Sequence, residues 1–320
     1  MKFSTRPTSA VVSGAIIFLA ACDSSSPNPV EPRASDAKPN LQVVSATRPI
    51  TGIWSAVVTE ASDVNNASFG RPASEWIGKT VTGSFSIQLT AAGVGDRNPS
   101  PTAWGFGPVP GPGPFIEFVT VTALIDGKAF QSSRAEYQNV FFGDVLLVDT
   151  SSVGSSFRPQ DSFVGAGTAG VGRSVVGFDA YFAAGGISYD GNTFALVPGL
   201  LRTGRGVVDD LLENQGLVVR KGTISFNVTG VSLSPAANLL TSVIELTGTG
   251  ALRPDQAAGL VDRINTITLR AEAGNISGAC NQLAIFAIQV QVIGIRGFLT
   301  PAARRSLTAQ TVSIRRELGC

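Results

Sequence analysis

The chain has 320 residues, a formal net charge of +1 and no histidine. A nearly neutral chain has no electrostatic reason to seek nucleic acid, so we expect no nucleic-acid partner. The lack of histidine excludes imidazole metal ligands and Ser-His or Cys-His nucleophile pairs, and three cysteines are too few for a sulfur metal site. We therefore expect no metal and no cofactor, whereas chemistry by paired carboxylates or by a Ser-Lys pair stays open.

Residues 1–21 have the three-part layout of an export signal. Lys2 and Arg6 give a positive start, Ala10–Leu19 is an apolar run, and two small residues follow it. An apolar run of about ten residues is too short to span a bilayer as a helix of the mature chain. We expect no membrane-spanning stretch later in the sequence either. The layout predicts an exported protein.

The end of this signal, Leu19-Ala20-Ala21-Cys22, resembles the lipobox of bacterial lipoproteins. The resemblance implies cleavage before Cys22, lipid on Cys22 and a location at the bacterial cell envelope, with the membrane leaflet left open. Two or more acyl chains give stable anchoring, so attachment to the membrane would depend on Cys22. The alternative is an ordinary signal peptide in which the cysteine stands by chance.

Residues 22–47 are rich in serine and proline and contain few large apolar side chains. A segment of this composition cannot bury enough apolar surface to fold. We expect it to form a disordered tether between the lipid and the first folded domain.

Residues 48–234 are predicted to form an antiparallel β-sandwich-like domain. Apolar and polar residues alternate in Val81–Leu89, in Val119–Ile125 and in Thr223–Val231, which is the period of a half-buried strand. Asp126-Gly127 offers a tight hairpin turn after the second of these runs. One exception is Val207–Asn214, whose Leu211-Leu212 pair and trailing glycine predict a short helix.

Residues 235–320 are predicted to form a small antiparallel helical bundle. Apolar residues recur at helical spacing in Pro254–Ala273, Ser277–Ile295 and Pro301–Leu318, and more weakly in Asn238–Thr247. The Ser277–Ile295 helix carries a second apolar row, formed by Ile285, Ile288, Val292 and Ile295. A helix that is apolar on two sides is usually central, so we expect it to lie between neighbours.

The same C-terminal region resembles a small helical domain, the FIMAH type, that recurs at the ends of exported bacterial proteins. The residues that carry the likeness are Gly274-Asn275, Ala279–Leu283, Phe286, Val290, Gly297, Leu299–Pro301 and Leu318–Cys320. Departures from the pattern occur at Ile276 and Arg304-Arg305. The resemblance implies an architecture and an extracytoplasmic setting, and it supplies no active site.

A second resemblance concerns Val81–Phe163, which is similar to β-domains of bacterial surface proteins with PEP-type sorting tails. Its hints are Thr82–Phe85, a run ending in Asp149, and Gln160–Phe163.

Cys280 and Cys320 bracket the last two predicted helices. If these helices are antiparallel, the start of one lies beside the end of the other, and an oxidising compartment favours a disulfide between the two thiols. The alternative is two free thiols.

A loop rich in proline and glycine, Asn98–Pro114, contains Trp104 and Phe106. Exposed aromatic rings on such a loop would suit a sugar or a polyproline-like partner. The alternative, which we favour, is a loop folded back over a sheet edge with Trp104 as its plug.

These features together predict a lipid-anchored cell-envelope protein with a binding or structural role and an envelope glycan or protein as partner. No catalytic residue is assigned, because no nucleophile elbow, phosphate loop or metal signature occurs. The alternative is a glycan-acting hydrolase that uses two carboxylates on the β-domain.

Overall fold

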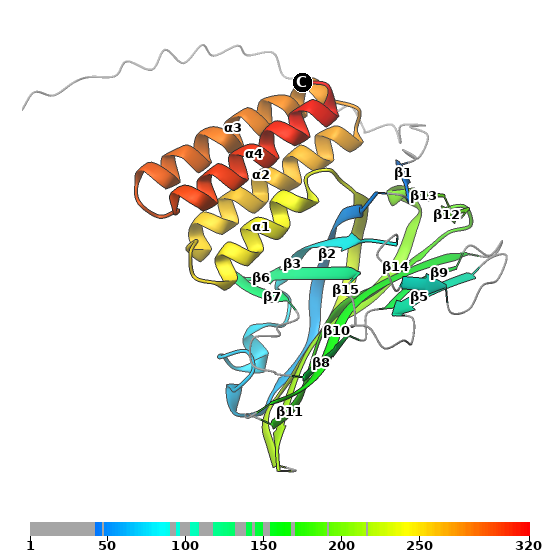
Figure 1. Ribbon diagram of the computed structural model, residues 1–320, viewed down its shortest axis with the longest axis vertical. Helices are drawn as coiled ribbons and strands as arrows, with labels where there is room; N and C mark the ends of the chain where they lie inside the picture. Colours follow the sequence, from blue (N-terminus) through cyan, green and yellow to red (C-terminus); the bar gives the residue numbers. More distant parts are fainter. Residues whose placement is uncertain are drawn as a thin grey trace, which may run out of the picture. The chain divides into compact units, whose positions relative to one another are not determined.

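The computed structural model describes residues 42–46, 48–89, 94–96, 103–108, 118–131, 139–142, 145–149, 154–167, 170–190, 192–215 and 217–320. All of them belong to one compact unit, Pro39–Cys320. Antiparallel strands form the N-terminal part of this unit and four helices form its C-terminal part (Figure 1), which confirms the predicted fold class. Residues 1–38, including Cys22, lie outside the described residues.

The described strands form one large antiparallel sheet and one small one. In spatial order the large sheet contains β4 (Val94–Asp96), β5 (Ala103–Pro108), β9 (Val145–Asp149), β10 (Ser155–Gly167), β11 (Gly170–Phe182), β14 (Leu201–Asn214), β15 (Leu217–Leu233), β2 (Ile50–Asp63), β3 (Thr80–Ile87), β6 (Val119–Ile125) and β7 (Lys128–Gln131), with β8 (Asn139–Phe142) beside β10. The small sheet contains β1 (Gln42–Ser45), β13 (Thr193–Leu196) and β12 (Ile187–Tyr189). Short 3-10 turns occupy Val64–Asn66, Ala73–Glu75 and Pro198–Leu200.

The large sheet bends so that β6 packs across the core against β10 and β11, although four other strands separate β6 from β11 in the sheet. Aromatic side chains fill the space that this bend encloses. The Trp54 ring lies 5.0 Å from the Phe226 ring and 5.1 Å from the Phe178 ring, and Phe85 and Phe157 pack beside them. The bent sheet is therefore sandwich-like, since its two ends cover a common core.

Two of the predicted alternating runs become β3 and β6, as expected. Val81, Phe85 and Ile87 of β3 are buried in the sheet core. The predicted hairpin turn is also confirmed, because Asp126 and Gly127 join β6 to β7 with φ angles of 47° and 77°.

The prediction of a helix at Val207–Asn214 is wrong, because these residues belong to β14. Val208 and Leu212 are buried, while Asp209 bonds to Arg173 of β11 and Asp210 pairs with Arg220 of β15. Two flanking strands supply backbone partners along the whole segment. Sheet pairing thus outweighs the local helical signal.

Part of the range predicted to be a disordered tether, Gln42–Ser45, forms strand β1. The Gln42 side-chain oxygen accepts a hydrogen bond from the Leu233 backbone N–H at 2.6 Å, and Val44 packs against the sheet core. The prediction of disorder does not hold for these four residues. The rest of that range lies outside the described residues, apart from Ala46.

The four helices are α1 (Ala237–Gly248), α2 (Pro254–Glu272), α3 (Ile276–Ile295) and α4 (Pro301–Leu318). Their ends follow the sequence: Pro254 and Pro301 occupy first helical positions, and the Asn275 and Thr300 side chains accept backbone N–H groups at the starts of α3 and α4. The predicted apolar stripes form their common core, with Leu260, Ile264, Leu283, Phe286, Val290, Leu307 and Ile314 buried.

Helix α1 joins the helical region to the sheet by packing on β3, β6 and β7 (Figure 1). Ile53 and Leu124, on two sheet strands, belong to the helical core, and the Ser84 hydroxyl of β3 bonds to the Thr241 hydroxyl of α1 at 2.7 Å. The polar face predicted for β3 is therefore covered by a helix.

Helix α3 packs against α2 and α4, as expected for a helix with neighbours, but its second apolar row is exposed. By length and composition α3 is apolar enough to cross a membrane, contrary to the expectation that no later stretch would be. Its other face is buried in the helical core through Ala279, Leu283, Phe286, Val290 and Ile293.

The predicted disulfide is present between Cys280 of α3 and Cys320, which follows α4, with the two Cα atoms 5.8 Å apart. We expect the Cys280→Ser/Cys320→Ser double variant to lose about 2–4 kcal/mol of unfolding free energy, because the bridge closes a long loop in the unfolded chain. Urea unfolding of residues 39–320 measures this loss. Two alkylatable thiols in the native protein, with an unchanged urea midpoint, would contradict the bridge.

Candidate functional site

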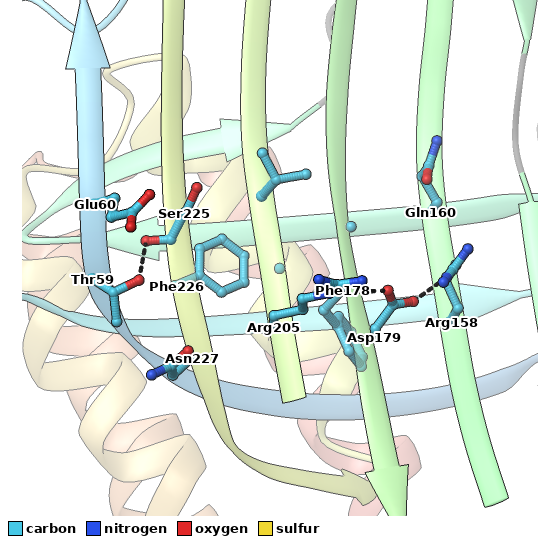
Figure 2. A pocket seen from close by; sticks show the side chains of 13 residues that line it. Thr59, Glu60, Arg158, Gln160, Phe178, Asp179, Arg205, Ser225, Phe226 and Asn227 are labelled. Carbon is cyan, nitrogen blue, oxygen red and sulfur yellow. Dashed lines mark hydrogen bonds and ion pairs between the residues drawn. The ribbon is translucent and has the colours of Figure 1, made fainter. Parts of the chain in front are cut away.

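A pocket of about 590 Å³ opens on the outer face of the large sheet, across β10, β11, β14, β15 and β2. We call it the outer pocket (Figure 2). Its lining side chains are mostly polar and include Glu60, Arg158, Gln160, Asp179, Arg205, Ser225 and Asn227. It is the strongest candidate site among the residues that the structure describes.

Strand register explains why these residues meet. One row of directly opposed residues crosses all five strands, namely Gln160, Gly177, Val207, Ser225 and Glu60. A second row, two positions along the strands, contains Asp179, Arg205 and Asn227. Directly opposed residues in antiparallel strands point to the same side of a sheet, so both rows face outward.

The opposite face of the same strands is packed tightly, which makes the pocket floor rigid. Phe178 and Phe226 are buried on that face against Trp54. Gly206, opposite Phe226, has to lack a side chain, because a Cβ atom there would lie 2.2 Å from the Phe226 ring. Any ligand in the outer pocket would therefore meet a preformed surface.

Ion pairs fix one end of the outer pocket (Figure 2). Arg158 donates a hydrogen bond from Nε to Asp179 Oδ1, and Arg205 Nε lies 3.8 Å from Asp179 Oδ2. The bond to Asp179 raises the pKa of the Arg158 guanidinium above its ordinary value. Asp179 is largely covered, with 15% of its side chain exposed, whereas 75% of the Arg205 side chain is exposed. The Arg205 guanidinium is thus available to an incoming group.

The two carboxylates of the outer pocket are far apart. Glu60 lies on β2 and Asp179 on β11, with β15 and β14 between them. Three inter-strand spacings of about 4.8 Å place their backbones about 14 Å apart across the strands. The Asp179 carboxylate also bonds to Arg158 of β10, on the side of β11 away from Glu60. Glycoside hydrolysis needs two carboxyl groups about 5–9.5 Å apart, so this pair does not provide that chemistry.

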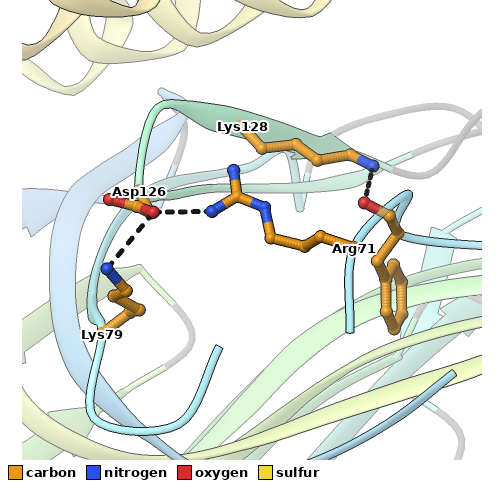
Figure 3. A network of polar contacts seen from close by, with 5 residues as sticks. Arg71, Lys79, Asp126 and Lys128 are labelled. Atoms are coloured by element: carbon orange, nitrogen blue, oxygen red, sulfur yellow. Dashed lines mark hydrogen bonds and ion pairs between the residues drawn. The ribbon is translucent and has the colours of Figure 1, made fainter. Parts of the chain in front are cut away.

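A second group of charged residues surrounds the turn between β6 and β7 (Figure 3), and we call it the turn cluster: Arg71, Lys79, Asp126 and Lys128. Asp126 accepts from Arg71 at 2.6 Å and lies 3.4 Å from Lys79. The bond from Arg71, reinforced by Lys79, lowers the pKa of the Asp126 carboxyl.

Lys128 is partly buried beside the Phe130 ring and donates to the Phe69 carbonyl oxygen at 2.6 Å. Burial lowers the pKa of Lys128, and the charge of Arg71 adds to this effect. The Arg71 guanidinium also lies 4.3 Å from the Trp76 ring centroid. These contacts tie the segment between β2 and β3 to the β6–β7 turn, so we assign the turn cluster a structural role.

The other predicted site residues lie elsewhere. Trp104 and Phe106 stand in β5, where their backbones pair with β9, so the prediction of a loop is wrong for Ala103–Pro108. The side chains of both residues lie outside the described part of the structure. Cys280 and Cys320 join α3 to the end of α4. Within the described ranges, no three acidic or sulfur side chains cluster closely enough to hold a metal ion.

Sequence reasoning missed the outer pocket. The sequence pattern that could have indicated it is the alternation of polar residues in the segments around Arg158, Asp179 and Arg205. This alternation places the polar side chains on one face of each strand. Sequence does not show which strands are neighbours, and the rows exist only after the strands pair.

Comparisons with known proteins give no significant match to any family model, curated protein sequence or solved structure. The resemblances to lipoproteins, to FIMAH-type domains and to PEP-type sorted surface proteins therefore stay predictions.

We expect Asp126→Asn to lower the unfolding free energy at neutral pH by less than about 1 kcal/mol, because the ion pairs of the turn cluster are partly exposed. Asparagine keeps the positive φ that this turn needs. The pKa of Asp126 is lower in the folded protein than in the unfolded chain. The ionised Asp126 carboxylate therefore adds to the unfolding free energy above the unfolded-state pKa, and this stabilisation is lost as the pH falls through the folded-state pKa.

The difference between the wild-type protein and Asp126→Asn, measured by urea unfolding, should thus shrink under acidic conditions. A difference that grows as the pH falls would contradict this assignment.

Proposed function

We propose that this protein is exported, anchored to the bacterial cell envelope by lipid on Cys22, and acts there as a binding protein. The positive start, the short apolar run and the lipobox-like Leu19–Cys22 support export and lipidation. The disulfide adds support, because it uses two of the three cysteines and leaves Cys22 as the remaining one. An anchored binding protein needs a surface turned to its ligand, and the outer pocket is the candidate.

The anchor is tested by expressing the full chain in a bacterium that processes lipoproteins. We expect labelled fatty acid on the wild-type chain and its recovery with membranes, whereas Cys22→Ser should lose the label. Ser24→Ala, two residues away, is the matched control and should keep it. Release of the unlabelled wild-type chain into the soluble fraction would contradict the anchor.

For the ligand, we infer a polar molecule rich in hydroxyl groups that carries an acidic group, which is the chemistry of an acidic envelope glycan. The observation that carries this inference is the exposed Arg205 guanidinium beside a row of hydroxyl, amide and carboxylate side chains. Arginine binds a carboxylate through paired hydrogen bonds, and Gln160, Ser225, Asn227 and Glu60 can bond to hydroxyls.

The glycan-hydrolase alternative gains no support from this pocket. Glu60 and Asp179 are too distant from one another to act as a pair, and Asp179 is already engaged by Arg158. A binding role without catalysis is therefore the better account of the outer pocket.

A glycan array with neutral and acidic oligosaccharides tests the ligand class, and calorimetry then gives affinities for the bound members. We expect acidic oligosaccharides to bind, and Arg205→Gln to weaken binding about tenfold or more, because a charge-assisted bond is lost. Arg202→Gln, an exposed arginine of the same strand outside the outer pocket, is the control and should bind normally. Equal binding by the wild-type protein and Arg205→Gln, or binding of neutral sugars alone, would overturn this ligand class.

A further inference from the structure

The exposed apolar row of α3 has no role in the core. Ile285, Ile288, Val292 and Ile295 stand at helical spacing on one face, and we call them the outer row of α3. Ile288 is 63% exposed and Ile295 is 77% exposed. The helix already buries a different row against α2 and α4. A contiguous aliphatic surface of this kind marks an interaction site.

The part of the chain that contains the outer row and follows it is positively charged. Helix α3 has no charged residue, and residues 274–320 contain five arginines and a single acidic residue, Glu317. The Arg304 side chain packs over Gly294 of α3, and Arg296 directly follows the helix. Aliphatic residues flanked by arginines match the surface of an anionic lipid bilayer, where the apolar face enters the headgroup region and the cations meet lipid phosphates.

Charge also disfavours a second copy of the chain as the partner that covers the outer row. Pairing two copies through α3 would bring the same arginine-rich regions toward one another, and like charges oppose such pairing. A lipid surface presents the opposite sign.

The described chain begins next to this helical region. Gln42 bonds to Leu233, and the following residue, Ser234, bonds through its hydroxyl to Thr268 of α2 at 3.0 Å. Helix α2 packs directly on α3. A flexible chain of about 20 residues spans about 25 Å. With the tether expected from the sequence between Cys22 and Gln42, a lipid on Cys22 would therefore keep the outer row at high local concentration near the same membrane. This argument alone rests on the proposed anchor.

We propose that the outer row of α3 lies on the surface of an anionic lipid membrane, as a contact separate from the lipid on Cys22. Helix α3 then lies parallel to the bilayer plane, with its buried row facing α2 and α4 and its outer row at the boundary between the lipid headgroups and the acyl chains.

Vesicle binding by residues 39–320 tests this proposal without the anchor, since this compact unit contains both apolar cores and the disulfide. We expect flotation with vesicles of phosphatidylglycerol and phosphatidylethanolamine, weaker flotation with phosphatidylcholine alone, and loss of binding in high salt. The double variant Ile288→Gln/Ile295→Gln should bind about tenfold less or weaker still, because two aliphatic side chains no longer enter the lipid.

Leu269→Gln is the matched control. Leu269 is 65% exposed on α2, close to the exposure of Ile288, but it lines a groove between α2 and the sheet. We expect it to bind vesicles like the wild-type protein. The substitutions by glutamine keep the net charge and the helical propensity. A loss of vesicle binding in the double variant but not in Leu269→Gln therefore reports burial of the outer row in lipid.

The proposal would be overturned by the absence of vesicle binding by the wild-type unit, or by an equal loss of vesicle binding in the double variant and in Leu269→Gln. A concentration-dependent dimer that Ile288→Gln/Ile295→Gln dissociates would also overturn it and would identify a second copy as the occupant. Because these proteins lack Cys22, none of these outcomes bears on the lipid anchor or on the outer pocket.

Discussion

The register of the antiparallel ladder through β10, β11, β14, β15 and β2 determines which side chains share a face of the sheet. On the inner face it brings Trp54, Phe178 and Phe226 together as the centre of the core. On the outer face it aligns Arg205 with Asp179 and builds the outer pocket. A slip of one residue in any strand would exchange the two faces, so core packing also fixes the pocket.

The helical region depends on the same sheet through α1, which covers the polar face of β3 and shares its core with Ile53 and Leu124. Helices α2 and α4 bury the inner side of α3, which leaves its outer row free of any core role. The molecule thus carries two unlike surfaces, a polar pocket on the sheet and an aliphatic row on a helix. A ligand and a membrane would not compete for them, because they belong to different elements.

Local pattern was enough to predict much of the fold. Alternation located β3 and β6, helical spacing located α2, α3 and α4, and the antiparallel order of the last two helices predicted the Cys280–Cys320 bridge. The predictions of secondary structure failed where pairing partners distant in the sequence determine whether a segment forms a strand. Val207–Asn214 is a strand because β11 and β15 flank it, and Gln42–Ser45 is a strand because β13 and Leu233 supply partners. The outer pocket needs five strands in register, which no local pattern contains.

Disulfide trapping tests that register most directly. Val207→Cys/Ser225→Cys places two thiols on directly opposed residues of β14 and β15, whereas Val207→Cys/Asn227→Cys places them two positions out of register. Opposed residues have Cα atoms about 4.5–5.5 Å apart, within the range of a disulfide, and the displaced pair lies beyond that range. The structure predicts rapid and complete bridging of the first pair in residues 39–320 and little bridging of the second. Preferential bridging of Val207→Cys/Asn227→Cys would contradict the register and the outer pocket with it.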